Sequence, residues 1–224
     1  MSSTDLPIRV VLWRHGQTDW NVENRFQGHT DIPLNDTGQA QVEKSALVLA
    51  SLRPNRLVTS DLLRARQTAA AIAKRCGLPV TIDPDLRETY GADWEGKTGL
   101  EIRKDTDAQF TAWLSGEDIP AGGTGERRSE VAARGISAIY RGLSEIESGQ
   151  SLVIVTHGGA ARSVIGTLMG LPVSEWASLG GLANASWSIL DERGKSDGSW
   201  RLIEHNSGTL PDPILDQESG DSIV

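Results

Sequence analysis

Two apolar segments lie far apart in the chain, and each is followed directly by a histidine. Residues 8–13 run into Arg14 and His15, and residues 151–156 run into His157. Continuous apolar runs of this length are typical of strands buried in a parallel sheet, and such sheets place ligands beyond the carboxyl ends of their strands. A lone histidine after a strand is usually a hydrogen-bonded polar residue without a chemical role. Two in equivalent positions, one of them beside an arginine, instead favour a reactive site at one edge of the sheet.

Strand and helix patterns alternate along the chain. Strands are expected at residues 8–13, 57–59, 79–82, 151–156, 185–190 and 200–203. Helices are expected at residues 38–51, at 126–148, at 159–169, and from a cap at Ser60 and Asp61 to about Cys76. The alternation predicts an α/β fold, a three-layer α/β/α sandwich with a mostly parallel central sheet that an antiparallel pair completes. Residues 83–125 lack a regular pattern, which predicts an irregular insertion over the C-terminal edge of the sheet.

Composition limits the domain organisation and the partners. No linker divides the chain, so residues 1–210 are expected to form one catalytic domain. The acidic residues 211–224 are expected to form a loosely held tail. The net charge of −8 disfavours nucleic acid as a partner but is compatible with a local basic pocket. The single cysteine, Cys76, excludes an intramolecular disulfide and a cysteine cluster for zinc. Neither a signal peptide nor a membrane-spanning run is recognisable, so we expect a cytoplasmic protein that does not bind membranes.

Side chains near the expected strand ends include the groups that phosphoryl transfer to a histidine requires. The attacking imidazole must be neutral, and a neighbouring arginine disfavours a second positive charge. The transferred group needs several fixed donors, and the leaving oxygen needs a general acid. The candidates are Arg14, His15, Arg64, Glu88 and His157. Singly, Arg64 could be a surface residue and Glu88 a partner of Arg87, so the prediction depends on convergence of the whole set at one sheet edge.

Six segments together resemble one protein family. They span residues 12–21, 25–28, 33–40, 59–69, 86–88 and 155–159, in the family's order, and they cover most of the chain. On these segments the chain resembles the histidine phosphatase superfamily, in its phosphoglycerate-mutase-like branch. The resemblance implies that His15 becomes phosphorylated and that Glu88 donates a proton and later activates water. It also implies that Arg14, Arg64 and His157 hold the phosphoryl group.

The same resemblance implies how the substrate is bound. Asn21, Gln27 and Gly28 match positions that line the phosphate pocket, and the backbone near Gly158 contributes to it. Members of the family require neither a metal ion nor a nucleotide, so no cofactor is expected. The expected partner is a small phosphorylated metabolite, and a homodimer is expected from the resemblance alone.

The segment after Glu88 separates two activities within the family. Mutases carry a longer insertion there, with extra basic residues that hold a bisphosphate. Residues 86–96 instead resemble the shorter and more acidic version found in phosphatases. We therefore expect a metal-independent phosphomonoesterase, with a phosphoglycerate mutase as the alternative. A catalytically silent phospholigand-binding protein on the same fold is a further alternative, which the presence of both a nucleophile and a general acid disfavours.

A closer resemblance concerns the substrate. Residues 179–187 and 199–202 are similar to the actinobacterial glucosyl-3-phosphoglycerate phosphatases, which would place the reaction in carbohydrate metabolism. Residues 122–129 depart from the compact Gly-Glu-Ser element usual in those enzymes and are expected to border the substrate. Trp20 and Trp94 lie near the site motifs and could stack on a sugar, although core packing is the commoner role of tryptophan.

One further motif is interpreted as a chance match. Residues 91–98 fit the P-loop pattern of nucleotide-binding proteins letter by letter. However, Asp93 and Glu95 would place two carboxylates in a loop that must hold phosphates, and no apolar strand leads directly into Gly91.

Overall fold

A computed structural model describes residues 6–193 and 198–208, whose strands form one six-stranded sheet in the order β3-β2-β4-β1-β5-β6. The strands are β1 (Arg9–Arg14), β2 (Arg56–Thr59), β3 (Val80–Ile82), β4 (Ser151–Thr156), β5 (Trp187–Glu192) and β6 (Trp200–Ser207). The first four run parallel, and β5 and β6 are antiparallel additions at one side. The predicted α/β fold with a mostly parallel sheet is confirmed. The predicted tail, 211–224, lies outside the described residues.

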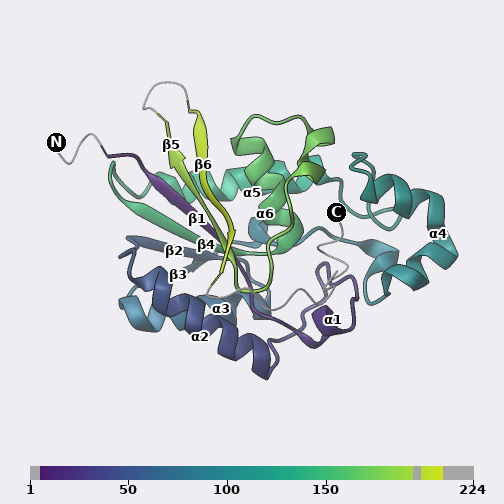
Figure 1. Ribbon diagram of the computed structural model, residues 1–224, viewed down its shortest axis with the longest axis horizontal. Coiled ribbons are helices and arrows are strands. Elements are labelled where there is room, and N and C mark those ends of the chain that lie inside the picture. Colours follow the sequence, from purple (N-terminus) through teal and green to yellow (C-terminus); the bar gives the residue numbers. More distant parts are fainter. Residues whose placement is uncertain (1–5, 194–197, 209–224) are drawn as a thin grey trace.

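Helices cover both faces of this sheet and so produce three layers (Figure 1). One face carries α2 (Asp36–Ala50) and α3 (Leu63–Cys76), and the other carries α5 (Arg128–Leu143) and α6 (Gly158–Leu168). The shorter helices are α1 (Asp19–Val22), η2 (Pro84–Leu86), η3 (Ala92–Trp94) and η4 (Val173–Ser178).

Alternate side chains of β1 enter two separate cores, because successive residues of a strand point to opposite faces. Val11 and Trp13 join the core beneath α2 and α3, and Val10 and Leu12 join the core beneath α5 and α6. All four side chains are fully buried. A strand between two helical layers must be apolar on both faces, which explains the uninterrupted apolar run from Val10 to Trp13.

The carboxyl ends of β1, β4 and β2 remain hydrogen-bonded beyond the last strand residues. The N–H group of His15 donates to the Thr156 carbonyl oxygen at 3.0 Å, and that of Ser60 donates to the Val155 carbonyl oxygen at 3.0 Å. Residues that follow three different strands are therefore held at one edge of the sheet.

The predicted cap of α3 is wrong. Ser60 and Asp61 precede the N-cap residue, Leu62, which makes no side-chain capping bond. The Ser60 hydroxyl lies 3.0 Å from Nε2 of His157, and Asp61 forms an ion pair with Arg87. Both side chains are thus committed to tertiary partners that local sequence does not reveal.

The helix α5 is shorter than the predicted span 126–148. Glu126 belongs to the preceding loop, where its N–H group donates to the Tyr90 carbonyl oxygen at 2.9 Å. The helix ends at Leu143, followed by Ser144 as its C-cap.

The insertion between β3 and α5 is more regular than predicted, because it contains α4 (Gly99–Leu114). A capping box formed by Thr98 and Glu101 begins this helix. Thr106 interrupts it with a non-helical φ of −144° and ψ of 46°. The interruption breaks the helical period of the apolar side chains, so the sequence pattern hid the helix. As predicted, the insertion lies beyond the carboxyl ends of the parallel strands (Figure 1).

The insertion packs around a small core that also includes Phe26, from the loop between α1 and α2. Its buried members are Phe26, Trp94, Ile102, Phe110, Trp113, Leu114 and Ala121. Trp94 is only 1% exposed and packs edge-on against Phe26, with 5.9 Å between the ring centroids. The suggestion that Trp94 stacks on a sugar is therefore wrong. Residues 91–98 include the short helix η3, and the Phe26 N–H group donates to the Lys97 carbonyl oxygen at 2.9 Å. This structure agrees with a chance match to the P-loop pattern.

Candidate active site

His15 lies at the carboxyl end of β1 with no exposed surface. Its Nδ1 atom is 2.7 Å from the Gly16 carbonyl oxygen. A carbonyl oxygen only accepts hydrogen bonds, so Nδ1 carries the proton and Nε2 carries the lone pair. Among the described residues, Nε2 has no hydrogen-bond partner. Burial and the charges of Arg64 and Arg14 hold the pKa of His15 well below its usual value, which keeps the imidazole neutral and nucleophilic at Nε2.

His157 follows β4 as the N-cap residue of α6, and both of its ring nitrogens are bonded. Arg64 donates from Nε to Nδ1 at 3.2 Å, so Nε2 carries the proton and donates to the Ser60 hydroxyl at 3.0 Å. Burial and the charge of Arg64 also hold the pKa of His157 well below its usual value. His157 is therefore a neutral residue that orients Arg64.

Two buried guanidinium groups flank the histidines. Arg64, fully buried, donates from Nη1 to the Thr30 carbonyl oxygen at 2.9 Å and from Nη2 to the Gly28 carbonyl oxygen at 2.8 Å. Arg14 passes close to the start of α6, because a Cβ atom on Gly158 would lie 3.3 Å from its Cζ. These backbone carbonyl groups orient the Arg64 guanidinium group, whose donor geometry matches a phosphoryl anion.

Glu88 sits against the N-terminus of α6 with 1% of its surface exposed. Its carboxylate accepts hydrogen bonds from the N–H groups of Thr89 at 2.8 Å, Gly159 at 2.9 Å and Ala160 at 2.9 Å. A Cβ atom on Gly159 would lie only 2.7 Å from Oε1 of Glu88. The helix start thus fixes the carboxylate, and the glycine makes room for it.

Asn21 presents an amide group to the same region. Its Oδ1 accepts hydrogen bonds from the Thr18 N–H group at 3.0 Å and from Nδ2 of Asn184 at 3.1 Å. Asn184 also donates to the His15 carbonyl oxygen at 3.3 Å. Nδ2 of Asn21 is buried and has no partner among the described residues. Gln27 is linked to this group, because its Oε1 lies 3.1 Å from the Thr18 hydroxyl.

The residues predicted from sequence therefore lie in one connected group at the sheet edge. They are Arg14, His15, Asn21, Gln27, Gly28, Arg64, Glu88, His157 and Gly158. Their catalytic and binding roles stay predictions.

Sequence reasoning missed several residues that support this group. His29 and Arg134 both donate to the Glu88 carbonyl oxygen, at 2.9 Å and 2.8 Å. Ser60 was interpreted as a helix cap, and Asn184 reaches His15 only through the tertiary fold. No local pattern marks these four residues, since each acts on a partner that is distant in sequence.

Two features of the described residues bear on other functions. No group of three or more His, Cys, Asp or Glu side chains in ranges 6–193 and 198–208 could hold a metal ion. Within the same ranges, no helix has the length and apolar character needed to cross a bilayer.

Comparison with known proteins identifies the family. The model of the histidine phosphatase superfamily (branch 1) matches residues 10–207. The chain belongs to this superfamily. Glucosyl-3-phosphoglycerate phosphatase of Mycolicibacterium vanbaalenii is 38% identical over 213 residues, which are 89% of this chain and 94% of the relative. The enzyme of the same name from Mycobacterium tuberculosis is 40% identical over 189 residues, covering 81% and 84% of the two chains.

Other relatives extend the comparison. A metal-independent phosphoserine phosphatase of Arabidopsis thaliana is 34% identical, with 88% of this chain and 83% of the relative covered. A mycobacterial glucosyl-3-phosphoglycerate phosphatase solved in complex with VO3 superposes with a TM-score of 0.82 at 37% identity, over 89% of this chain and 99% of that one. This member of the superfamily is a phosphatase, as predicted from residues 86–96. A probable phosphoglycerate mutase of Photorhabdus laumondii, 33% identical with 82% and 85% covered, represents the alternative.

Proposed function

We propose that this phosphatase hydrolyses a small phosphate monoester through a phosphohistidine on His15, without a metal ion. One observation carries the proposal: His15 combines a neutral imidazole with a buried, unpartnered Nε2 atom among the described residues. A buried polar atom without a partner is costly and rare, so a substrate atom is its natural partner. The neighbouring guanidinium groups of Arg14 and Arg64 match the charge of a phosphoryl group.

In the first step, the Nε2 lone pair of His15 forms a bond to phosphorus. The bond between phosphorus and the ester oxygen breaks, and its electron pair stays on that oxygen. Glu88, protonated for this step, gives its proton to the leaving oxygen, which departs as an alcohol. Arg14, Arg64 and the Nδ2 atom of Asn21 stabilise the charge on the phosphoryl oxygens.

In the second step, a water molecule attacks phosphorus as the Glu88 carboxylate takes one of its protons. The phosphorus–nitrogen bond breaks and its electron pair returns to Nε2 of His15. Inorganic phosphate is released, and Glu88 is again protonated for the next cycle. One carboxyl group thus serves both steps in opposite directions.

The substrate we propose is glucosyl-3-phosphoglycerate, which places the enzyme in carbohydrate metabolism. The proposal is supported by the relatives of that name and by the similarity of residues 179–187.

A homodimer and a cytoplasmic location are further proposals. The first is supported by family resemblance and the second by the single, unpaired Cys76. Light scattering of the purified protein tests the dimer.

Phosphate release in the presence of a chelator tests the reaction. The panel comprises glucosyl-3-phosphoglycerate, 3-phosphoglycerate, sugar phosphates and p-nitrophenyl phosphate, and a metal-dependent phosphatase serves as the control that the chelator must silence. We expect undiminished turnover with a strong preference for the glucosyl ester. Broad weak activity would remove the substrate assignment. If a bisphosphate stimulates the interconversion of phosphoglycerates, the protein is a mutase. If the esters bind without turnover, it is a silent phospholigand-binding protein.

A further inference from the structure

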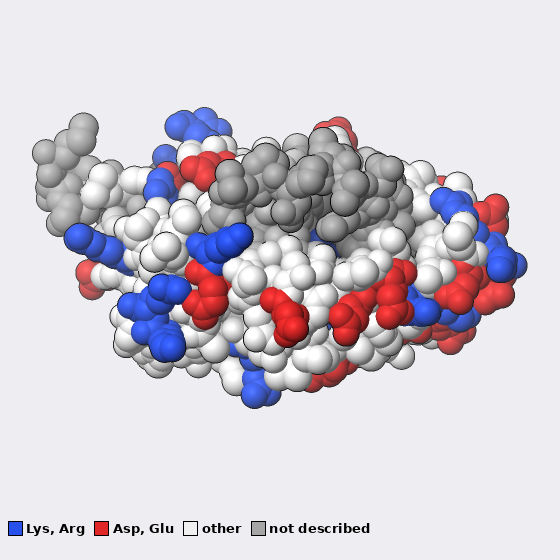
Figure 2. All heavy atoms as spheres, turned by 60° about the horizontal axis from the view of Figure 1, so that its bottom comes forward, with Lys and Arg blue, Asp and Glu red and all other residues white. Residues whose placement is uncertain are grey.

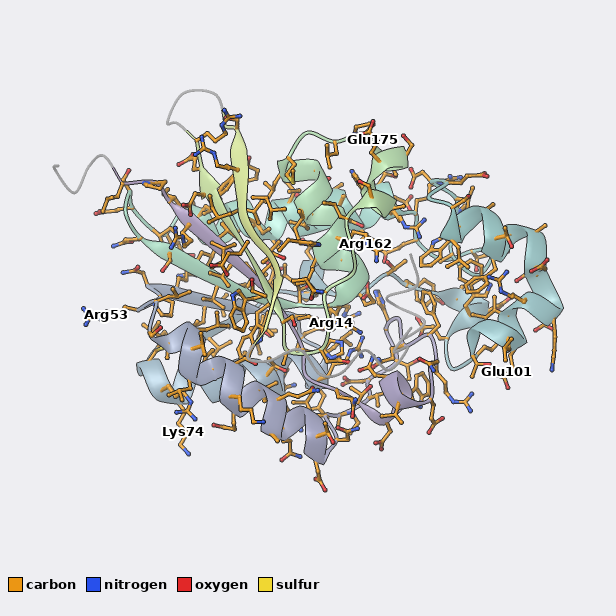
Figure 3. All side chains as sticks on the ribbon, viewed as in Figure 1. Arg14, Arg53, Lys74, Glu101, Arg162 and Glu175 are labelled. Atoms are coloured by element: carbon orange, nitrogen blue, oxygen red, sulfur yellow. The ribbon has the colours of Figure 1, made fainter. Side chains whose placement is uncertain are left out.

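Charged side chains of this protein differ in how far solvent reaches them. Figure 2 shows Lys, Arg, Asp and Glu side chains spread over one face, and in Figure 3 Lys74 and Glu101 extend outward from the ribbon. Ion pairs between such exposed groups contribute little to stability. The pair of Arg134 with Glu126 is different, because the two side chains are only 16% and 22% exposed. It lies against the segment that carries Glu88, where a rigid contact can control the backbone of the proposed general acid.

The backbone of Glu88 lies between two short helices and belongs to neither. It follows η2 and precedes η3, in a stretch, residues 87–91, that contains no helix or strand. The hydrogen bonds of a helix or a sheet therefore do not fix it. The start of α6 holds the Glu88 carboxylate, but the direction of that side chain also depends on where its backbone lies. Tertiary contacts must supply this second restraint.

Arg134 supplies such contacts from α5. Its Nη1 atom donates to the carbonyl oxygens of Asp85 at 2.8 Å and Arg87 at 2.6 Å. Its Nη2 atom donates to the carbonyl oxygen of Glu88 at 2.8 Å. One side chain thus holds three backbone carbonyl groups in the stretch that leads into the proposed general acid.

Glu126 fixes the orientation of Arg134. Its carboxylate accepts hydrogen bonds from Nε of Arg134 at 2.8 Å and from Nη2 at 2.9 Å, and also from the Tyr90 N–H group at 2.8 Å. An arginine side chain carries five N–H groups, and all five are used here: one at Nε, two at Nη1 and two at Nη2. Arg134 therefore has no N–H group left for a phosphoryl oxygen and acts only on the groups that it holds.

The helix α5, which carries Arg134, packs against α6. The two helices approach so closely that a Cβ atom on Gly135 would lie 2.7 Å from Val164 of α6. Both ends of Glu88 thus depend on one packed pair of helices, its backbone on α5 and its carboxylate on α6. Proton transfer requires hydrogen-bond distance between the acid and the leaving oxygen, so small shifts of either end impair it.

We propose that Arg134 is a positioning residue for the general acid, which fixes the backbone of Glu88 so that the carboxyl group meets the leaving oxygen of the ester. This inference rests on the proposed function, in which Glu88 gives its proton to that oxygen. No bond forms or breaks at Arg134, so its loss should impair the steps that need the proton of Glu88.

The test compares kcat/KM for two alkyl esters, glucosyl-3-phosphoglycerate and 3-phosphoglycerate, with that for p-nitrophenyl phosphate. The alcohols need a proton as they leave, whereas p-nitrophenolate does not. We expect Arg134→Gln to lower kcat/KM about 10- to 100-fold for the alkyl esters and far less for the aryl ester. The loss is partial, because His29 still donates to the Glu88 carbonyl oxygen at 2.9 Å. A defect that merely reduces the amount of active protein would lower all three values by the same factor.

Two further variants define the comparison. Arg141→Gln is the matched control, because Arg141 lies on the same helix and pairs with Asp83 and Asp85, but only through their side chains and with 52% of its own side chain exposed. It should leave kcat/KM unchanged for every ester. Arg134→Lys keeps a positive charge beside Glu126 but has three donors instead of five. It should show the same selective loss to a smaller degree, and it covers the case in which Arg134→Gln does not fold.

A double-mutant cycle separates this inference from the proposed function. If Arg134 acts through Glu88, Arg134→Gln should lower kcat/KM for alkyl esters no further in a protein that already carries Glu88→Gln. Full additivity of the two losses would overturn the inference. If Glu88→Gln is selective for alkyl esters but both Arg134 variants impair all esters equally, or none, the positioning role is wrong and the proposed function stands. If Glu88→Gln itself impairs all esters equally, the acid role fails and this inference fails with it.

Discussion

The imidazole rings of His15 and His157 lie side by side, with 5.1 Å between their centroids and planes tilted by 59°. They meet because β1 and β4 are adjacent parallel strands in which Arg14 pairs with Thr156. Their surroundings nevertheless differ. Both nitrogens of His157 are bonded, to Arg64 and Ser60, whereas Nε2 of His15 is unpartnered among the described residues. The two histidines are therefore not interchangeable in the proposed mechanism.

This difference predicts distinct effects of two alanine substitutions. His15→Ala removes the nucleophile and should lower kcat by about 1,000-fold or more. His157→Ala removes a group that orients Arg64 and is predicted to hold the phosphoryl group, and it should leave a phosphoenzyme that forms slowly. Acid-quenched reactions with a radiolabelled ester measure the phosphoenzyme directly. Radiolabel trapped on the His15→Ala protein, or full turnover by it, would contradict the assignment of His15 as the nucleophile. The control is His205→Asn, which removes a histidine on β6, outside the candidate site.

A second prediction concerns the leaving group. Glu88→Gln cannot supply a proton, so kcat/KM for an alkyl ester should fall about 100-fold or more, which is typical for loss of a general acid. p-Nitrophenolate leaves without protonation, so kcat/KM for its ester should fall far less. This parameter includes only the steps through departure of the leaving group, which excludes the later role of Glu88 toward water. Equal losses on both esters, in a variant whose circular dichroism is unchanged, would argue against the acid role.

The sheet and its reactive edge could be predicted because their signals are local. The apolar runs that end at Trp13 and Thr156 specify strands buried on both faces, and parallel strands bring their following residues to one edge. That geometry places Arg14, His15 and His157 together before any contact is known.

What sequence did not reveal depends on tertiary contacts or on broken periodicity. α4 was hidden because Thr106 interrupts its helical period, although the Thr98 and Glu101 pair marked its start. Ser60 was assigned to a cap, because the partner that occupies its hydroxyl, His157, lies in another strand–helix junction. Arg128 could not be placed, since its burial depends on the packing of α5 against α6 and on the Trp113 ring.

A third prediction tests how α6 positions Glu88. Gly159→Ala would place a Cβ atom 2.7 Å from Oε1 of Glu88, so the carboxylate must move. A displacement of this size should lower kcat/KM for alkyl esters about 10- to 100-fold. Gly180→Ala is the matched control, because a Cβ atom there meets nothing within 4 Å and should leave activity unchanged. Steady-state kinetics on both variants checks the prediction, and unimpaired hydrolysis by Gly159→Ala would refute this positioning role.

The last prediction concerns stability and pH. His15 and His157 are buried in the neutral form with lowered pKa values, whereas in the unfolded chain each takes up a proton near its ordinary pKa of about 6.5. The unfolded state thus binds more protons below that pH, so the free energy of unfolding should fall by about 2–3 kcal/mol between pH 7.5 and 5.5. Arg87 lowers the pKa of Asp61, and Arg134 lowers that of Glu126 against the opposing effect of burial. Both carboxylates therefore lose their contribution to stability only at more acidic pH, outside this window. Urea unfolding at the two pH values measures the change. His15→Gln does not titrate there and should show a smaller fall, to which His157 and His29, whose pKa burial also lowers, still contribute. Equal stability of the wild type at both pH values would show that these imidazoles are not held neutral.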